Sequence, residues 1–360
     1  MTSYIIRRLL LLVPTLIGIT IVTFSIMVLS PGGLRATIAN REGGLDPRAR
    51  VAIRNFYEKK YGLDQPAYVQ YLRWLNRVSF VGVKVSSVGW PATRFGFKRP
   101  DLGESIAERR PVLDIIEECL PITLLLNAIT IPIVMTLSIW SGVLAAKHRG
   151  GILDIAGGTT MLGLWSVPQI WAGVLLVGYL ANRSNLQWFP TAGLHDLRAD
   201  EMSFLPNFAG GFHRGWLLDT MWHLVLPVIA LSYGGFAFTS KLTRSAMLEN
   251  IAADYVRTAR AKGLDESVIL YRHVLRNGLL PLITNFASLL PGLISGSVVV
   301  EWIFSLPGMG RLGVDAVFDK DPEMVLSVTL IASILGLLSF LIADVSYVLA
   351  DPRVSFEAET

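Results

Sequence analysis

Cysteine is almost missing from this 360-residue sequence, which contains one, Cys119. A single cysteine excludes a disulfide framework within the chain and any cysteine-ligated metal cluster. Histidine is also scarce: the five copies lie far apart, and none forms the H-E-x-x-H spacing of a helical zinc site. The sequence therefore predicts no metal site.

Signatures of nucleotide binding and of hydrolysis are missing as well. No glycine is followed by lysine anywhere, so the chain has no G-x-x-x-x-G-K-[ST] loop to cradle phosphates. No G-x-S-x-G elbow offers a nucleophilic serine. We therefore expect that the chain is not an enzyme and binds no cofactor of its own.

Charge is missing from six long apolar blocks. Apolar residues make up 52% of the chain, and the mean hydropathy of +0.50 lies outside the range of soluble proteins. Each block can cross a hydrocarbon core of about 30 Å, the fourth only just, because a helix rises about 1.5 Å per residue. The expected fold is an all-α polytopic membrane protein with six transmembrane helices. The blocks are residues 9–34, 119–146, 155–182, 224–240, 279–300 and 324–343.

The lack of charge in these blocks also bears on how transport could be driven. An ion-coupled carrier and an intramembrane enzyme both need ionisable side chains at membrane depth. Here the nearest such groups, Glu301 and Asp344, sit at the ends of blocks. A pathway without ionisable groups implies that its driving force comes from another protein.

Basic residues in the short loops predict the orientation, because cytoplasmic loops carry an excess of Lys and Arg. Residues 147–149 and the long loop after the fourth block are basic, whereas residues 315–323 are mostly acidic. Both termini are then cytoplasmic, with residues 1–34 as the first span and 351–360 as a tail. A cleaved signal peptide is disfavoured, since the first block is too long and lacks a small-x-small cleavage site.

This topology places residues 35–118 outside the cytoplasm, as a folded segment that is either a cap over the span ends or a docking surface for a soluble partner. Its basic composition is no contradiction, because segments longer than about 60 residues escape the positive-inside bias. Residues 47–61 predict one helix, and Pro66 opens a second. The second helix carries a stripe of Tyr68, Leu72 and Leu75. A hairpin strand is predicted by the alternation of Val81, Val83 and Val85.

The stretch from Glu249 to Pro281 is basic and amphipathic, and it lies between two apolar blocks. A helix is predicted over residues 252–262, with Gly263 in the left-handed conformation that ends helices. Asp265 is expected to cap a second helix that reaches about Asn277. The first helix presents Ile251, Tyr255 and Ala259 on one face. We interpret the stretch as the site where a soluble protein binds this membrane protein.

Several motifs together resemble permeases of ATP-binding-cassette (ABC) importers of the dipeptide/oligopeptide/nickel family. The segment 257–263, RTARAKG, followed by 273–277, HVLRN, is similar to the cytoplasmic coupling loop of that family. The tail at 351–357 is similar to the microcin C and longer-peptide subgroup. Further matching motifs are Arg7-Arg8-Leu9, Asp101-Leu102-Gly103-Glu104-Ser105, Val300-Glu301-Trp302-Ile303-Phe304, Leu306-Pro307-Gly308-Met309-Gly310 and Asp351-Pro352-Arg353.

The resemblance implies a type I importer permease in a bacterial cytoplasmic (inner) membrane, with a five-helix core at 119–350 and coupling helices at 249–278. It implies uptake of peptides or peptide-like solutes by alternating access. The implied partners are a second homologous permease, two ATP-binding subunits that carry ATP and Mg²⁺, and an extracytoplasmic substrate-binding protein. The implied coupling residues are Tyr255, Arg257, Ala259, Arg260, Ala261, Gly263, His273, Arg276 and Asn277.

The match departs from the general importer pattern at two places, and it leaves the residues of the substrate pathway undecided. Arg257, Thr258 and Ala259 stand where that pattern has Glu-Ala-Ala, a basic variant common in the peptide subfamily. Residues 78–100 form a longer loop than is usual for the family. Neutral polar side chains in the later spans are candidates for the substrate pathway and equally for hydrogen bonds between helices. These are Gln169, Asn285, Ser288 and Ser295.

Two other classes of function remain at this point. A membrane scaffold or receptor would use the same basic loop to recruit a cytoplasmic partner without transport. A membrane-embedded enzyme would need an ionisable cluster facing a cavity, which the sequence does not offer. Nucleic-acid binding is disfavoured, because the net charge of +4 is spread over loops that flank apolar spans.

Overall fold

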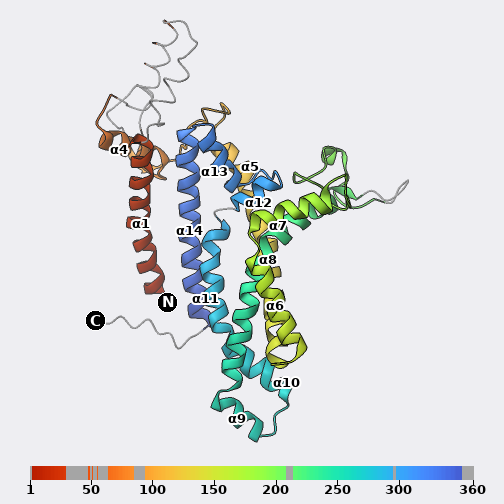
Figure 1. Ribbon diagram of the computed structural model, residues 1–360. Helices are drawn as coiled ribbons and strands as arrows, with labels where there is room; N and C mark the ends of the chain where they lie inside the picture. The colour runs from red at the N-terminus through yellow and green to blue at the C-terminus, as the bar shows by residue number, and fades with distance from the viewer. Residues whose placement is uncertain are drawn as a thin grey trace. The chain divides into compact units, whose positions relative to one another are not determined.

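The computed structural model describes residues 2–29, 64–84, 94–207, 214–294 and 297–350, with residues 48, 51 and 55. Most of these residues are helical (Figure 1). The α-helices are α1 (Thr2–Leu29), α4 (Ala67–Val78), α5 (Val112–Lys147), α6 (Ile152–Ser166), α7 (Gln169–Leu176), α8 (Gly215–Ile251), α9 (Asp254–Ala261), α10 (Glu266–Val268), α11 (Leu275–Ile294), α12 (Val298–Ile303), α13 (Met309–Phe318) and α14 (Pro322–Ala350). The π-helices are η1 (Val177–Ala181) and η3 (Ile269–Val274), and η2 (Ala199–Glu201) is a 3₁₀ turn. The tail 351–360, Ser295 and, apart from residues 48, 51 and 55, the predicted helix at 47–61 lie outside the described residues.

Among the described helices, α1, α5, α8 and α14 are each long and apolar enough to cross a membrane. A fifth candidate is the pair α6 and α7–η1, which is bent by 94°. The block 155–182, expected to form one span, is therefore broken at Val167–Pro168, and its crossing of the membrane stays a prediction. Val167 takes an extended conformation at the break (φ −81°, ψ 122°), because the ring of Pro168 disfavours a helical residue before it.

The block predicted as one helix over 279–300 is also divided. Helix α11 ends at Ile294, and a separate short helix, α12, begins at Val298. The chain as a whole is a helical membrane protein. It forms two compact units, one comprising 1–8, 121–311 and 335–360, the other 9–120 and 312–334.

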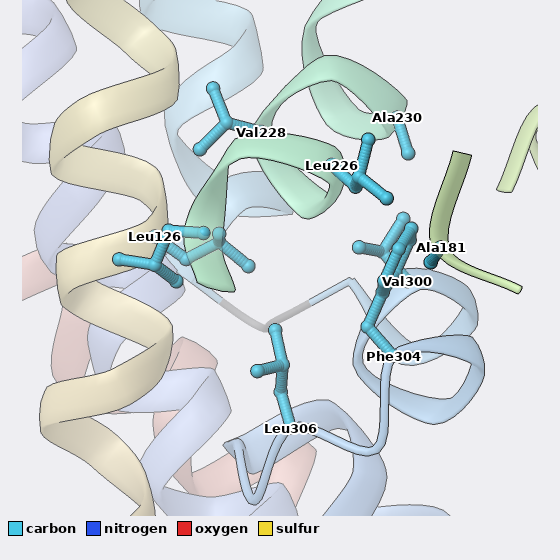
Figure 2. Packing of buried hydrophobic residues seen from close by; sticks show 9 residues of the cluster. Leu126, Ala181, Leu226, Val228, Ala230, Val300, Phe304 and Leu306 are labelled. Atoms are coloured by element: carbon cyan, nitrogen blue, oxygen red, sulfur yellow. The ribbon is translucent and has the colours of Figure 1, made fainter. Parts of the chain in front are cut away.

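The core of the first unit joins α5, α8, α12 and η1. Leu126, Leu226 and Phe304 are each 1% exposed, and Val300 and Leu306 are fully buried. Figure 2 shows these side chains projecting from different elements into one space. In a membrane such contacts stabilise helix association by close packing, since lipid is as apolar as the side chains themselves.

In the second unit, α4 packs against α1 and is followed by a β-hairpin. Strand β1 (Val81–Lys84) pairs antiparallel with β2 (Arg94–Phe97), which confirms the predicted hairpin strand. The buried residues of α4 are Trp74 and Val78. Two residues of the predicted stripe face outward: Tyr68 is 69% exposed and Leu72 is 58% exposed.

The motif Asp101–Ser105 is held by two acidic residues at the start of α14. The guanidinium of Arg77 donates to both carboxylate oxygens of Glu323, at 2.8 and 2.7 Å. Asp321 accepts from the hydroxyl of Ser105 at 2.7 Å. Gly103 has a φ of +83°, and a Cβ there would lie 2.6 Å from the Glu323 carboxylate, so this position requires glycine. Asp321 and Glu323 therefore form hydrogen bonds within this chain, to Ser105 and Arg77.

Candidate functional site

The basic stretch predicted to bind a partner forms two helices joined by a tight turn. Gly263 adopts a φ of +76°, as predicted. Its N–H donates to the carbonyl of Arg260 at 2.9 Å, and the N–H of Leu264 donates to that of Ala259 at 3.3 Å. These two bonds form a Schellman motif, which satisfies the last carbonyls of α9. A Cβ at Gly263 would meet no atom within 4 Å, so the backbone conformation alone favours glycine.

Asp265 caps the helix that follows, also as predicted. Its carboxylate accepts the N–H of Ser267 at 3.0 Å and the hydroxyl of the same residue. Its hydrogen bonds to Ser267 lower the pKa of Asp265. The predicted end of this helix near Asn277 is wrong, because α10, η3 and α11 continue without a break to Ile294. Gly278 does not end the helix: it is a place of close packing, where a Cβ would lie 3.4 Å from the sulfur of Met247.

An apolar core fastens these helices to the ends of α5 and α8. Val256 of α9 and Val274 of η3 are fully buried, and Ile269 is 1% exposed. They pack in one cluster with Val143 of α5 and Met247 of α8. Because this part of the chain extends beyond the apolar block 224–240, burial from water stabilises it, by about 0.8 kcal/mol per CH₂ group. We call this cluster, with Ala146, Ala259 and Leu270, the coupling core.

The buried face of α9 differs from the predicted one. Ala259 is 8% exposed and belongs to the coupling core, but Tyr255, which the spacing placed on the same face, is 37% exposed, and Val256 is fully buried. The hydroxyl of Tyr255 donates to the side-chain carbonyl of Asn250 at 2.9 Å. Tyr255 therefore belongs to the outward surface of the segment.

Most predicted coupling residues share that outward surface. Arg260 donates to Glu266 across the Gly263 turn, with N–O distances of 2.5 and 3.1 Å. These bonds raise the pKa of Arg260 and lower the pKa of Glu266. Arg257 lies 3.5 Å from Asp254 and has 77% of its side chain exposed. The exposed members of the predicted set are Tyr255, Arg257, Arg260, Ala261, Gly263, Arg276 and Asn277, whereas His273 is half-buried.

Sequence reasoning missed the ion pair that fixes α6 to α8 at the same end. Asp154 is 5% exposed and accepts from the Nη2 of Arg244 at 2.7 Å and from its Nε. The N–H of Gly150 also donates to the carboxylate of Asp154, at 3.0 Å. The two residues lie 90 positions apart, so no local spacing signals the pair.

A second missed feature is the buried carboxylate of Glu301, for which the sequence suggested only a place at the end of a span. Glu301 has no exposed surface, and it accepts the N–H of Arg311 at 3.0 Å. A Cβ at Gly308 would lie 2.5 Å from this carboxylate, and one at Gly310 would lie 3.0 Å from it. The backbone of the motif 306–310 thus lies directly against the carboxylate of Glu301.

Two of the four predicted pathway residues link helices. Gln169 donates to the carbonyl of Ala230 at 3.2 Å, and Asn285 donates to the hydroxyl of Thr239 at 3.2 Å. Both bonds end on α8, at different levels. The side chain of Ser288 and the whole of Ser295 are outside the described part of the chain. A role of these residues in a substrate pathway stays a prediction.

Comparison with known protein families identifies the family to which this chain belongs. The model of the binding-protein-dependent transport system inner membrane component matches residues 138–356, and its N-terminal companion matches residues 1–127. The chain belongs to this family. It is a membrane-embedded permease subunit of an ABC importer and not an enzyme, and it belongs in the inner membrane.

Relatives match this permease over nearly its whole length. The oligopeptide transport system permease protein AppB of Bacillus subtilis (strain 168) is 37% identical, over 99% of this chain and 100% of its own. The di/tripeptide transport system permease protein DppB of Pseudomonas aeruginosa (strain UCBPP-PA14) is 33% identical, over 98% and 99%. The peptidoglycan transport system permease protein YejB of Agrobacterium fabrum (strain C58 / ATCC 33970) is 31% identical, over 99% of both.

A solved structure supports the fold of the permease. A chain of the inward-facing MetNI methionine ABC transporter superposes with a TM-score of 0.50, covering 66% of this chain and 97% of that one. At 16% sequence identity this likeness speaks for the fold alone. The ABC importer permease fold expected from the sequence is confirmed.

Proposed function

We propose that this permease moves peptides or peptide-like solutes into the cytoplasm by alternating access, paired with a second homologous permease. ATP hydrolysis takes place on two separate subunits that bind ATP and Mg²⁺, and an extracytoplasmic binding protein delivers the solute. The printed names of AppB and DppB, which specify oligopeptides and di/tripeptides, support this class of cargo.

The observation that carries the proposal is the coupling core. Val256 and Ala259 of α9 share it with Val143 of α5 and Met247 of α8. A force applied to α9 therefore reaches two long helices through packed side chains, which a loop without a core would not transmit. The exposed surface around Gly263 is then the part that contacts the ATP-binding subunits.

The test is the substitution Ala261→Trp, which adds bulk on the exposed end of α9 without entering the coupling core. We expect the complex reconstituted in liposomes to lose both substrate-stimulated ATP hydrolysis and peptide uptake. Arg198→Trp, at an exposed position in the 182–207 loop, is the matched control and keeps both activities. Wild-type coupling in Ala261→Trp would remove this surface from the mechanism. A membrane scaffold instead predicts that no ATP-hydrolysing chain co-purifies.

We also propose six spans with both termini in the cytoplasm and residues 35–118 outside. The basic residues of the 249–278 stretch and of 147–149 support this orientation. In a Cys119→Ala background, a membrane-impermeant maleimide should label Leu197→Cys in intact cells. It should label Ala261→Cys only after permeabilisation. The reverse pattern would invert the topology.

A further inference from the structure

Helix α4 carries more apolar surface than its neighbour covers. Residues three or four apart share a helix face, so Tyr71, Trp74 and Val78 form one stripe, and Tyr68 and Leu72 form the adjacent one. The first stripe is turned toward the protein, with Trp74 and Val78 each 7% exposed. The second stripe is 69% exposed at Tyr68 and 58% exposed at Leu72.

The first stripe packs on the membrane-spanning helix α1. The hydroxyl of Tyr71 lies 2.9 Å from that of Thr20, which is 3% exposed. The ring of Phe24 meets the ring of Tyr71 edge-on at 5.5 Å and that of Trp74 at 5.9 Å. Helix α4 is therefore attached to α1 at the level of Thr20 and Phe24. Figure 1 shows α4 beside one end of α1.

This level lies inside the hydrocarbon part of the bilayer. The most apolar window of α1, Leu9–Ile26, has 18 residues, which span about 27 Å and so fill a core of about 30 Å. Thr20 precedes the end of that window by six residues, or about 9 Å. The hydroxyl of Tyr71 must reach the same depth, so α4 cannot stand clear of the membrane surface.

We infer that α4 is an interfacial helix whose exposed stripe, Tyr68 and Leu72, inserts into the leaflet at the C-terminal end of α1. In the proposed topology this is the outer leaflet. An amphipathic helix lying in the interface buries its apolar face to a depth of about 5–10 Å, which matches the depth of Thr20. Tyrosine is favoured at this level because its ring is apolar and its hydroxyl reaches water.

The neighbouring surface points to lipid as the occupant. Only 11% of the Leu9–Ile26 window is buried within the protein. The remainder of α1 is apolar surface that is available to lipid, and the adjacent stripe of α4 continues this surface. Arg73 lies on the opposite, polar side of α4 and is exposed, which suits a position among headgroups. The interfacial helix thus holds the middle of the extracytoplasmic segment at a set depth in the membrane interface.

The test measures the depth of nitroxide labels in the complete transporter in liposomes, on a Cys119→Ala background. Labels go to Tyr68→Cys and Leu72→Cys, to Arg73→Cys as the matched control on the same helix, and to Leu197→Cys as a control for water. Collision with oxygen reports lipid, and collision with a water-soluble nickel chelate reports water. We expect oxygen to dominate at 68 and 72 and the nickel chelate to dominate at 73 and 197.

Two results would overturn the inference. If positions 68 and 72 meet the nickel chelate as readily as position 197 does, the stripe faces water. If both labels are immobilised and shielded from both reagents, a protein partner covers the stripe. Peptide uptake by each labelled complex shows that the helix is in place, and the two positions report independently of each other.

Discussion

The hydroxyl of Thr123 donates to the carboxylate of Glu301 at 3.1 Å, and neither residue has exposed surface. The same hydroxyl oxygen accepts the N–H of Met309 at 2.8 Å. One buried carboxylate therefore ties α5 to α12 and, through Arg311, to the first turn of α13. Buried polar networks are stable when every member has a partner, and here the motif residues provide those partners.

Removing this carboxylate should destabilise the permease. In Glu301→Ala, the hydroxyl of Thr123 and the N–H of Arg311 both lose their acceptor. An unsatisfied buried group such as the hydroxyl of Thr123 costs about 1–3 kcal/mol, and the partly buried N–H of Arg311 costs less. We expect a lower unfolding temperature for the purified protein in detergent, and a smaller decrease for Glu301→Gln, which keeps an acceptor oxygen. Equal unfolding temperatures for wild type and Glu301→Ala would contradict the role of the network.

The glycine that wraps around the carboxylate allows a second test of the same site. A Cβ at Gly308 would lie 2.5 Å from Glu301 and 2.7 Å from the hydroxyl of Thr123, whereas one at Gly336 would meet nothing within 4 Å. We therefore expect Gly308→Ala to lower the unfolding temperature through overpacking, which costs about 1–3 kcal/mol. Gly336→Ala is the matched control. It should leave the temperature unchanged or raise it.

The features that could be predicted from the sequence are those set by neighbouring residues. Gly263 and Asp265 act on backbone groups within a few positions, so the turn between the two helices could be recognised from residue types alone. The bonds of Thr123 to Glu301 and of Arg244 to Asp154 span 178 and 90 positions, and they depend on helix packing that no local pattern encodes.

The choice of the buried stripe on a short helix shows the same limit. Periodicity predicted an apolar stripe of Tyr68, Leu72 and Leu75 on α4 without showing which side packs, and the adjacent stripe with Trp74 is the one that meets α1. An amphipathic helix with a wide apolar face allows either orientation. Only the position of its partner decides between them.

Loosening the coupling core should uncouple ATP hydrolysis from transport. Val256 is fully buried, so Val256→Ala removes two methyl groups and leaves a cavity, at about 1–3 kcal/mol. A less rigid α9 transmits less of the motion of the ATP-binding subunits. We expect fewer peptides transported per ATP in proteoliposomes. Val268→Ala is the matched control, since Val268 is 38% exposed, and it should keep the wild-type ratio. An unchanged ratio in Val256→Ala would separate the core from coupling.

The cap formed by Asp265 should depend on pH in acid. Its hydrogen bonds to Ser267 hold the folded-state pKa below the ordinary value of 3.8. The stabilisation is thus complete above the unfolded-state pKa and is lost as the pH falls through the folded-state pKa. Hydrogen exchange of the first turn of α10, corrected for the intrinsic rate, should accelerate as the pH drops below about 4. In Asp265→Asn, which caps without titrating, this acceleration should be absent; if it persists, another group is responsible.

Breaking the pair of Asp154 and Arg244 should cost more than breaking an exposed pair in the same region. In Arg244→Ala, the carboxylate of Asp154, which is 5% exposed, keeps only the N–H of Gly150. Leaving a fully buried charge without its partner lowers the free energy of unfolding by about 3–5 kcal/mol. We expect a loss of about 2 kcal/mol here, because a third of the Arg244 side chain is exposed to solvent.

The matched control is Arg257→Ala. Arg257 and Asp254 are 3.5 Å apart with 77% and 96% of their side chains exposed, so water screens the pair and its loss should not change the unfolding temperature measurably. The exchange Asp154→Arg with Arg244→Asp should recover part of the stability that Arg244→Ala loses. Equal unfolding temperatures for Arg244→Ala and Arg257→Ala would show that burial adds nothing to the ion pair. In that case α6 would depend on its apolar contacts with α8 to hold its position.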